Sequence, residues 1–286
     1  MSSMPILNMN TLVKTDMELQ MNRDSCMVCG TSEFKAVCEK SGFIYVSCAT
    51  CEVVRQYPYP EEYEIVEYYT DYKTKKAADS VYLTDAGFEI FKRDKELTFA
   101  DLGLGGGFVG KSILDVGCGT GQFVQMMTQE AGSIKGIDIS GECIRLARDR
   151  NLNCESQDFL ALNEVYDVIT MWHIIEHTLK PRQYIEHAYR MLASGGLLLI
   201  ETPVIGVIST GFGADWRYFM PVEHINLFTQ NALFRVCTDA GFRIQSWIRF
   251  GSGNEAGTVP ASNKRAMDLS AKKLGFGDTI AAVFVK

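Results

Sequence analysis

The stretch from residue 112 to residue 138 constrains the fold more than any other part of this chain. It begins with the apolar run SILDV, continues with the glycine turn GCGTG, and is followed by QFVQMMTQEAG, whose apolar residues recur at helical spacing. A second apolar run, IKGIDIS, carries Asp138. A strand, a tight glycine turn, a helix and a second strand that ends in an acid are the parts of a nucleotide-binding βαβ unit. The sequence therefore predicts a parallel sheet with its ligand at this turn.

The same region also matches the P-loop pattern G-x-x-x-x-G-K-[ST], through Gly105, Gly110, Lys111 and Ser112. A P-loop requires a helix directly after its Lys-Ser pair, because the helix N-terminus helps to bind phosphate. Here ILDVGCGTG follows, and each of its glycines would destabilise a helix by about 1 kcal/mol. We therefore reject the P-loop and interpret Lys111 as a solvated residue that precedes a strand.

The residues after the glycine turn distinguish between possible nucleotides. Asp138 follows Gly121 by seventeen residues, a separation at which an acid can accept both hydroxyl groups of a ribose. The NAD fingerprint G-x-G-x-x-G would require glycine at position 122, where Gln122 stands. Asp115 precedes the first glycine and suits the α-ammonium of S-adenosylmethionine, directly or through water. The pattern thus favours S-adenosylmethionine over NAD.

Together with the turn, the segments SQDFL, YDVITMWHIIEH, SGGLLLIETP, EHINLFTQNALFRVCTDAGF and GFGDTIAAVFVK resemble the class I S-adenosylmethionine-dependent methyltransferases. The resemblance covers residues from about 110 to 286 and implies an α/β fold with a doubly wound, seven-stranded Rossmann-like sheet. It also implies cofactor-binding residues: Asp115, Gly117, Cys118, Gly119 and Gly121 in the turn, Asp138 and Ile139 at the ribose, Asp158 and Phe159 at the adenine, and Trp172 after the fourth strand.

Hydrophobic periodicity supports the same fold independently. Strand-like runs at 167–172 and 197–202 alternate with helix-like runs at 181–195 and 231–241. Alternation of strands and helices predicts a parallel sheet with ligands at its switch point.

A second motif lies near the start of the chain. CMVCG and CATCE form a C-x2-C-x18-C-x2-C array, whose members are Cys26, Cys29, Cys48 and Cys51. Each C-x2-C turn directs two thiolates to one point, so two such turns can close a tetrahedral site. FKAVCEK and FIYVSC lie between the pairs and predict the strands of a zinc ribbon. Zinc is the expected metal, with a rubredoxin-like iron site as the alternative. The role of the metal would be structural, because so small a module cannot bury enough surface to fold without it.

The whole layout resembles the small-molecule branch of these methyltransferases that carries an N-terminal zinc-binding module and includes deoxysugar C-methyltransferases. Those enzymes have a further C-terminal domain without a counterpart in this sequence, so a sugar substrate stays open. We expect an N-terminal tail at 1–22, a zinc-ribbon module with a tyrosine-rich connector at 23–75, and a class I methyltransferase domain at 76–286, with a polar boundary at 71–80.

The connector YPYPEEYEIVEYYTDY holds six of the twelve tyrosines of the chain. An amphipathic helix that docks the zinc module on the main domain accounts for this pattern. A lid that covers the substrate is the alternative.

Two histidines are candidates for a general base, which an acceptor hydroxyl or carbon acid would require. His173 follows the fourth predicted strand, and His224 lies after the fifth, among Trp216, Tyr218 and Phe219. Histidine titrates near neutrality, and aromatic side chains suit a pocket wall. His224 could instead make a structural hydrogen bond, and the three aromatic residues could belong to the core.

The segment HIIEH at 173–177 matches the H-x-x-E-H pattern of inverted zinc peptidases. That chemistry requires both histidines on one helix, whereas this segment directly follows a predicted strand and soon meets Pro181. We therefore expect Glu176 and His177 to shape a loop. His187 lies in the middle of the next predicted helix, and we interpret it as part of a solvated face.

Composition narrows the classes of partner. The net charge of −7 disfavours a broad nucleic-acid surface, and the first residues carry charges that exclude a secretory signal. The best apolar run is broken by Glu201 and Pro203, so no membrane span is expected. The sequence thus predicts a cytoplasmic methyltransferase with a small-molecule acceptor. An RNA methyltransferase that holds RNA with its zinc ribbon and a non-catalytic cofactor-binding protein are the alternatives, and the sequence does not indicate an oligomeric state.

Overall fold

The computed structural model describes residues 25–65, 67–68, 83–255 and 258–286. The expected tail at 1–22 and the polar boundary at 71–80 lie outside the described residues. None of the described helices is long and apolar enough to span a bilayer.

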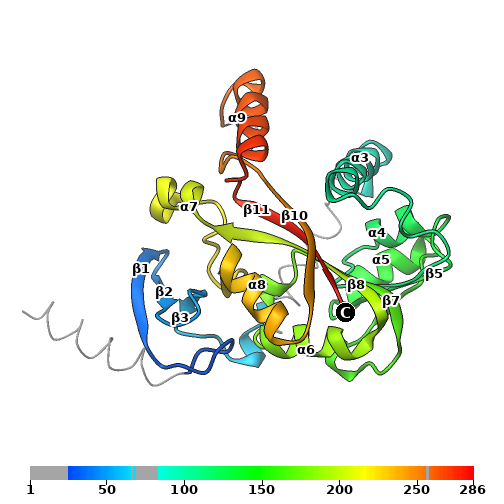
Figure 1. Cartoon of the computed structure of the whole chain (residues 1–286), viewed down its shortest axis with the longest axis horizontal. Coiled ribbons are helices and arrows are strands. Elements are labelled where there is room, and N and C mark those ends of the chain that lie inside the picture. Colours follow the sequence, from blue (N-terminus) through cyan, green and yellow to red (C-terminus); the bar gives the residue numbers. More distant parts are fainter. Residues whose placement is uncertain (1–24, 66, 69–82, 256–257) are drawn as a thin grey trace, which may run out of the picture.

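A seven-stranded sheet forms the centre of the molecule, in the order β6-β5-β4-β7-β8-β11-β10 (Figure 1). Its strands are β4 (Ser112–Val116), β5 (Ser133–Asp138), β6 (Cys154–Ser156), β7 (Tyr166–Trp172), β8 (Leu192–Ile205), β10 (Arg243–Phe250) and β11 (Thr279–Val285). Neighbouring strands from β6 to β8 are parallel, whereas β11 runs antiparallel to both β8 and β10. The prediction of a seven-stranded Rossmann-like sheet is confirmed, including its closing strand at the end of the sequence.

Helices cover both faces of the sheet. One face packs against α3 (Asp85–Leu102), α4 (Gln122–Met127) and α5 (Gly141–Asp149), and the other against α6 (Pro181–Met191) and α8 (Gln230–Asp239). Successive strand residues alternate between the two cores: Ile113 and Val168 lie in the first, Leu114 and Ile169 in the second. Further helical elements are α7 (Val207–Phe212), α9 (Ala261–Leu274) and the short 3-10 turns η2 (Phe159–Ala161), η3 (Ile175–His177) and η4 (Gly213–Asp215). Helix α9 projects from the body at the top of Figure 1.

Local sequence sets where these helices begin and end. Ser140 caps α5 by accepting a hydrogen bond from the backbone N–H of Cys143 at 3.3 Å, and α6 begins with Pro181 in its first turn. The prediction that α6 continues to residue 195 is wrong. Leu192 has extended dihedral angles and pairs with Tyr166, so the helix ends at Met191 and the chain enters β8 at once.

The four-cysteine module, residues 25–57, extends the same sheet. Strands β1 (Phe34–Lys40), β2 (Phe43–Cys48) and β3 (Val54–Tyr57) form an antiparallel ribbon, and β3 pairs with β9 (Asn226–Thr229). Strand β9 in turn pairs with the end of β8, so sheet hydrogen bonding runs from the ribbon into the central sheet. The ribbon forms the blue part at the left of Figure 1. Both strands predicted between the cysteine pairs are confirmed with their bounds.

Candidate cofactor and metal sites

The four cysteines of the array converge at one point. Their Sγ atoms all lie within 4.8 Å of one another, with Cys26 and Cys51 at 3.6 Å and Cys29 and Cys48 at 3.5 Å. Four thiolates bound to one zinc ion at 2.3 Å would be separated by about 3.8 Å, so the cluster has the size and the donor set of a tetrahedral zinc site. Each pair sits on a tight turn: the N–H of Gly30 donates to the carbonyl of Cys26 at 2.8 Å, and Glu52 N–H donates to Cys48 at 3.1 Å. Zinc binding is therefore supported by geometry and chemistry alike.

The predicted glycine turn joins β4 to α4. Gly117 has φ 69° and lies directly against Ile174, so that a Cβ at this position would stand 1.9 Å from Cδ1 of Ile174. Gly119 and Gly121 also have positive φ angles, 54° and 85°. The N–H of Cys118 donates to the carbonyl of Ile137 at 2.9 Å and ties the turn to the neighbouring strand. Strand β4 begins at Ser112, where a P-loop would need a helix, so the rejection of the P-loop is confirmed.

A cavity of about 550 Å³ opens at the carboxyl ends of β4 and β5. Its volume is in the range of cofactor and small-molecule pockets, about 300–1,000 Å³. The predicted cofactor residues that line it are Gly117, Asp138, Ile139, Asp158 and Phe159. The connector contributes Glu62 and Ile65, and the segment after β7 contributes residues 177–180. Segments that lie far apart in the sequence therefore enclose a single space.

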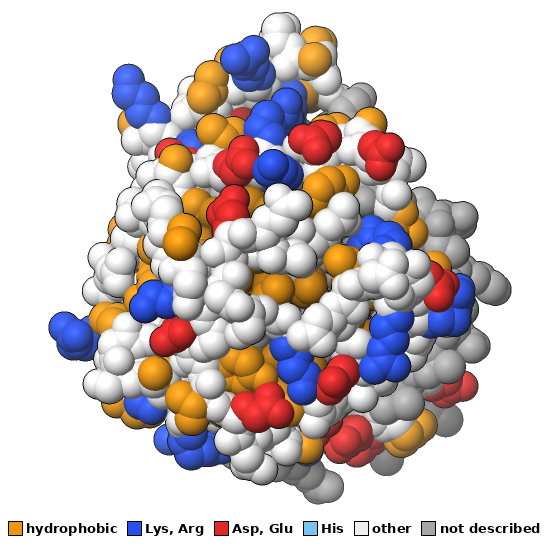
Figure 2. Space-filling model, turned by 90° about the vertical axis from the view of Figure 1, so that its right-hand side faces the viewer, with side chains coloured by type: hydrophobic (Ala, Val, Ile, Leu, Met, Phe, Trp, Pro, Cys, Tyr) orange, Lys and Arg blue, Asp and Glu red, His pale blue; other side chains and the backbone are white. Residues whose placement is uncertain are grey.

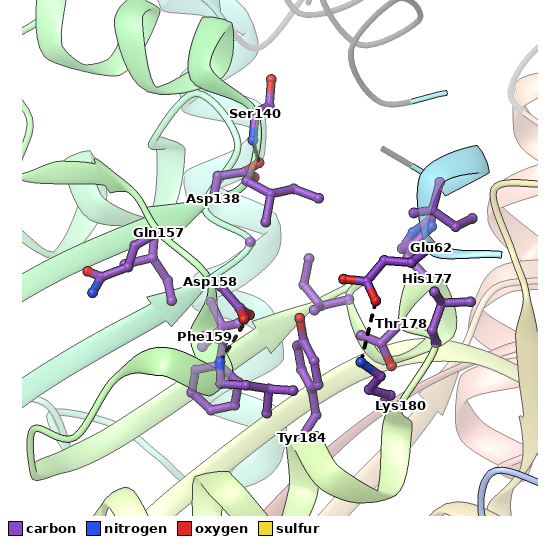
Figure 3. A pocket seen from close by; sticks show the side chains of 18 of the residues that line it. Glu62, Asp138, Ser140, Gln157, Asp158, Phe159, His177, Thr178, Lys180 and Tyr184 are labelled. Atoms are coloured by element: carbon purple, nitrogen blue, oxygen red, sulfur yellow. Dashed lines mark hydrogen bonds and ion pairs between the residues drawn. The ribbon is translucent and has the colours of Figure 1, made fainter. Parts of the chain in front are cut away.

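Asp138 stands at one wall of this cavity, Glu62 and Lys180 pair at the opposite wall, and Tyr184 lies along the lower side between them (Figure 3). The Asp138 carboxylate accepts hydrogen bonds from the N–H of Gly119 at 2.9 Å and the N–H of Ser140 at 2.8 Å. These bonds orient both oxygens and leave each with a second lone pair. The carboxylate can thus accept hydroxyl donors from a ligand in the cavity.

The apolar end of the cavity is formed around Phe159. The Phe159 ring lies 5.2 Å from the Tyr184 ring and 4.9 Å from the ring of His187, and the Asp158 carboxylate accepts from the N–H of Leu160 at 3.1 Å. The interpretation of His187 as a solvated residue is wrong. It is 5% exposed because its ring packs against Phe159 of η2, and burial lowers its pKa.

The other predicted cofactor residues do not line the cavity: Asp115, Cys118, Gly119, Gly121 and Trp172. Asp115 is buried beneath the turn, where its carboxylate accepts from Thr170 Oγ1 at 2.7 Å, and burial raises its pKa to about 7. The Trp172 ring packs against Phe123 at 5.2 Å, with the ammonium of Lys95 4.0 Å from its centre. Its indole N–H is buried and has no hydrogen-bond partner among the described residues. Both side chains support the turn from below.

His173 lies between two carboxylates. Nδ1 is 3.0 Å from Oε1 of Glu176, and Nε2 is 3.4 Å from Oε1 of Glu201. Glu176 also accepts from Thr202 at 2.9 Å, and Glu201 pairs with Lys95 at 2.8 Å. Burial alone would lower the pKa of His173, but the two carboxylates raise it to about 9. Although 37% of the side chain is exposed and solvent weakens this field, the direction favours an imidazolium at neutral pH.

His177 and His224 lie nearby in a different environment. Nδ1 of His177 is 2.6 Å from the carbonyl oxygen of Glu223, and Nδ1 of His224 is 2.8 Å from that of Tyr218. Burial lowers the pKa of His224. Glu176, His177 and His224 place potential metal ligands within 4.8 Å of one another. His173 and His177 do not share a helix, because the segment leaves β7 and makes only the short turn η3, as predicted.

The aromatic residues around His224 divide between core and site. Trp216 is fully buried and Phe219 nearly so, and the indole N–H of Trp216 donates to Asp278 at 3.1 Å. Tyr218 is partly exposed, and its ring lies 6.4 Å from the His173 ring and 5.8 Å from the His224 ring. Of the two interpretations, the core is the right one for Trp216 and Phe219.

A family model described as a methyltransferase domain matches residues 92–246, more than half of the chain. The chain belongs to this methyltransferase family. A ubiquinone biosynthesis O-methyltransferase of Klebsiella pneumoniae is 30% identical over 107 residues, which are 34% of this chain and 44% of that protein. The protein of the same name from Nitrosomonas europaea is 30% identical over 107 residues, 34% of this chain and 46% of its own length. The chain thus spans less than half the length of the relatives it matches.

Solved structures agree on the fold. A complex of the Haloferax volcanii Trm112 methyltransferase activator with a methyltransferase gives a TM-score of 0.55 at 15% identity, covering 75% of this chain and 97% of that one. The plantazolicin methyltransferase BpumL, solved with S-adenosylhomocysteine, gives a TM-score of 0.53 at 19% identity. The match covers 78% of this chain and 93% of BpumL. An Archaeoglobus fulgidus S-adenosylmethionine-dependent methyltransferase gives a TM-score of 0.51 at 19% identity. The match covers 70% of this chain and 94% of that one. At such identities the likeness concerns the fold alone.

The connector docks on the methyltransferase domain, as predicted. The hydroxyl of Tyr59 donates to the carbonyl of Leu179 at 2.9 Å and accepts from the side-chain amide of Asn226 at 3.0 Å. The hydroxyl of Tyr68 is 3.0 Å from the carboxylate of Glu223. The connector also contributes Glu62 and Ile65 to the lining of the cavity, so one segment both docks on the domain and borders the cavity.

Sequence reasoning missed two charged residues beside the site. Lys95 lies on α3, whose sequence shows no motif, and Glu201 lies on β8. A usable signal existed for Glu201, because an ionisable residue in the apolar run LLLIET requires a buried partner. Its partner could not be identified, because Lys95 is 106 residues away in the chain.

Proposed function

We propose that this protein is an S-adenosylmethionine-dependent methyltransferase that acts on a small-molecule acceptor. The observation that carries the proposal is the cavity that begins at Gly117, passes the Asp138 carboxylate and ends at the Phe159 ring. These three features, in a chain of the methyltransferase family, suit the amino-acid, ribose and adenine parts of one ligand.

The residues present fit that cofactor. The backbone at Gly117 is bare because no side chain fits beneath Ile174, so a ligand can approach it closely. Asp138 offers lone pairs for two ribose hydroxyls, and its own hydrogen bonds keep it in place. S-adenosylmethionine supplies a methyl group already activated on a sulfonium, so the protein needs no covalent nucleophile. Its contribution is alignment, which can lower the barrier by about 7–11 kcal/mol.

An acceptor hydroxyl or carbon acid would also lose a proton, and His224 is the base we propose. Its Nδ1–H donates to the Tyr218 carbonyl, which leaves the lone pair on Nε2, and burial keeps the ring neutral. His173 is a poor base by the same reasoning, because an imidazolium held between two carboxylates has no lone pair to offer. The two histidines predicted as bases thus receive different roles.

A small-molecule acceptor is supported by the names of the matched relatives, which are O-methyltransferases of ubiquinone biosynthesis. On the face in Figure 2, positive and negative side chains are interspersed rather than gathered into a basic surface. Nucleic-acid binding depends on such clusters of Lys and Arg. The zinc ribbon then serves as structure, since it shares a hydrophobic core with the methyltransferase domain through Val28 and Val53.

Calorimetric titration with S-adenosylhomocysteine tests the cofactor assignment. Wild-type protein should bind one equivalent, Asp138→Ala should bind at least about tenfold more weakly through loss of hydrogen bonds to a charged acceptor, and Lys111→Met should bind as the wild type does. No binding to the wild type, or tight binding of ATP that Lys111→Met abolishes, would refute the proposal.

The acceptor class is tested by incubation with methyl-labelled S-adenosylmethionine and three pools: small phenols, small ketones and total cellular RNA. Label should enter a small molecule, and His224→Gln should reduce its rate without changing the affinity for S-adenosylhomocysteine. Label confined to RNA, with an affinity that falls steeply with salt, would overturn the small-molecule assignment.

A further inference from the structure

Two histidines and a glutamate gather at the edge of the cavity. Glu176 and His177 belong to η3, and His224 lies in the loop before β9. Each offers one ligand atom, and the three atoms all lie within 4.8 Å of one another. The N–H of Ile225 donates to the carbonyl of Glu176 at 2.9 Å, so the backbone holds the two segments together. Because His177 also lines the cavity, the cluster borders the space in which the cofactor is placed.

Both imidazoles of this cluster have their Nδ1 atoms engaged. Nδ1 of His177 is 2.6 Å from the carbonyl oxygen of Glu223, and Nδ1 of His224 is 2.8 Å from the carbonyl oxygen of Tyr218. Since a carbonyl oxygen only accepts, Nδ1 carries the proton of each neutral ring and Nε2 carries the lone pair. Histidines that bind metal ions usually donate their other N–H in this way, because the bond fixes the tautomer and the direction of the ring. The two rings are thus prepared to offer Nε2 to an ion.

The carboxylate of the cluster is fully buried and faces imidazoles. Oε1 of Glu176 lies 3.0 Å from Nδ1 of His173 and 3.9 Å from Nε2 of His177, and Oε2 accepts from Thr202 at 2.9 Å. Within the described part of the chain, no lysine or arginine forms an ion pair with it. Each carboxylate oxygen has two lone pairs, so these contacts orient the group and leave it able to bind an ion. One carboxylate with two imidazoles is a donor set typical of transition-metal sites.

The dimensions of the cluster also suit such an ion. Nitrogen and oxygen ligands at about 2.0–2.2 Å from a tetrahedral ion are about 3.4 Å apart. The separations here reach at most 4.8 Å, so a bound ion would draw the three side chains slightly together. Three protein ligands leave a further position for water or another molecule. The donors differ from those of the four-cysteine site, because imidazole and carboxylate do not have the softness of thiolate.

We propose that Glu176, His177 and His224 form a second metal site, which binds one divalent transition-metal ion and thereby prevents His224 from acting as a base. The site itself is independent of the proposed function, whereas its effect on methyl transfer rests on it. The lone pair on Nε2 of His224 is the one that would accept a proton from the acceptor, and the same lone pair would bind the ion. Ligation and proton transfer therefore exclude each other, so methyl transfer should be inhibited by the ion.

Titration of the full chain with Co²⁺ tests the site, after a mild chelator and elemental analysis have established one zinc ion per chain. Wild-type protein should bind one equivalent of Co²⁺ without the intense absorption band of a cobalt thiolate, as expected for nitrogen and oxygen ligands. Glu176→Gln and His177→Gln should each weaken this binding by more than the about 10–100-fold that follows from changing a neighbour of a ligand. His187→Gln removes a buried histidine outside the cluster, and as the control it should bind Co²⁺ as the wild type does.

His177→Gln is the second variant if Glu176→Gln does not fold, because the His177 side chain is 15% exposed and borders the cavity. In the assay with methyl-labelled S-adenosylmethionine, saturating Co²⁺ should slow the wild type by about a hundredfold or more, which is the usual contribution of a general base. His177→Gln keeps His224, so Co²⁺ at the same concentration should leave its own rate unchanged.

Four results would overturn the inference: no second equivalent in the wild type, Co²⁺ that gives only the thiolate band, full binding by both variants, or a wild-type rate that Co²⁺ does not lower. A wild-type protein that binds Co²⁺ at this cluster, yet transfers no methyl group in its absence, would instead refute the proposed function.

Discussion

The contact between Gly117 and Ile174 gives the sharpest prediction about the turn. A Cβ at Gly117 would stand 1.9 Å from Cδ1 and 2.7 Å from Cγ1 of Ile174, far inside the 3.5–4.0 Å at which carbon atoms pack. Gly119 provides a matched control, because it also has a positive φ, 54°, yet has no atom within 4 Å of where its Cβ would lie. The two alanine variants therefore share backbone strain and differ in the steric overlap.

The expected magnitudes follow from these two effects. Holding an L-residue in the left-handed region destabilises the fold by about 1–2 kcal/mol, which is the whole effect expected for Gly119→Ala. Gly117→Ala adds overpacking of about 1–3 kcal/mol, for a total of about 2–5 kcal/mol. Because Ile174 borders the cavity and follows His173, its displacement should also weaken binding of S-adenosylhomocysteine, whereas a fold-wide loss of stability alone would not.

Urea unfolding followed by circular dichroism measures the free energies, and a double-mutant cycle isolates the contact. Ile174→Ala removes both close atoms and leaves Cβ at an ordinary 3.8 Å, so adding Gly117→Ala to it should destabilise the protein only as much as Gly119→Ala does. If Gly117→Ala and Gly119→Ala prove equally destabilising, or if Ile174→Ala gives no relief, the steric argument is wrong.

Three further predictions concern other parts of the molecule. Burial raises the pKa of Asp115 to about 7, so the folded state binds this proton more tightly than the unfolded state does. The free energy of unfolding should therefore fall as pH rises from about 4 to 7, by up to about 1.4 kcal/mol per pH unit. Asp115→Asn should lose this dependence, as measured by urea unfolding at pH 5 and 7. Tyr59→Phe removes hydrogen bonds to Leu179 and Asn226 and should destabilise the protein by about 1–3 kcal/mol, with faster amide exchange in β3; unchanged exchange would show that the connector docks by other contacts. Cys48→Ser, or chelation, should remove one equivalent of zinc by elemental analysis and unfold the ribbon, and full retention of zinc would contradict the four-cysteine site.

Much of the fold was predictable because its signals are local. The run from Ser112 to Asp138 combines strand, turn and helix signals in sequence order, and glycine is required where φ is positive. The cysteine spacing and the alternating runs between the pairs specify a ribbon in the same way. Two helix ends were misplaced. The helix predicted to run from Gln122 to Gly132 ends at Met127. The end of α6 at Met191 lies where no glycine or proline stops the helical pattern, so only the pairing of Leu192 with Tyr166 determines it.

The site was predictable in part. Asp138, Asp158 and Phe159 follow strands whose carboxyl ends meet at one edge, and the cavity indeed brings them together. Trp172 and Asp115 lie at the same edge but point into the protein, because alternate residues of a strand face opposite sides and the depth of each depends on the helices that cover it. The interpretation of His187 as solvated was wrong because the Phe159 ring that buries it comes from another segment of the chain.

By itself, the sequence determined the class of sheet, the glycine turn and the clustering of the four cysteines, because each depends on backbone conformation or spacing within a short segment. Only the tertiary structure decided the direction in which the pKa of each histidine shifts. His173 and His224 are alike in sequence, but one meets Glu201 and, beyond it, Lys95 across the fold, while the other is buried against a backbone carbonyl. Protonation depends on the charges and solvent within a few ångströms, and in a folded chain most of those neighbours come from distant positions in the sequence.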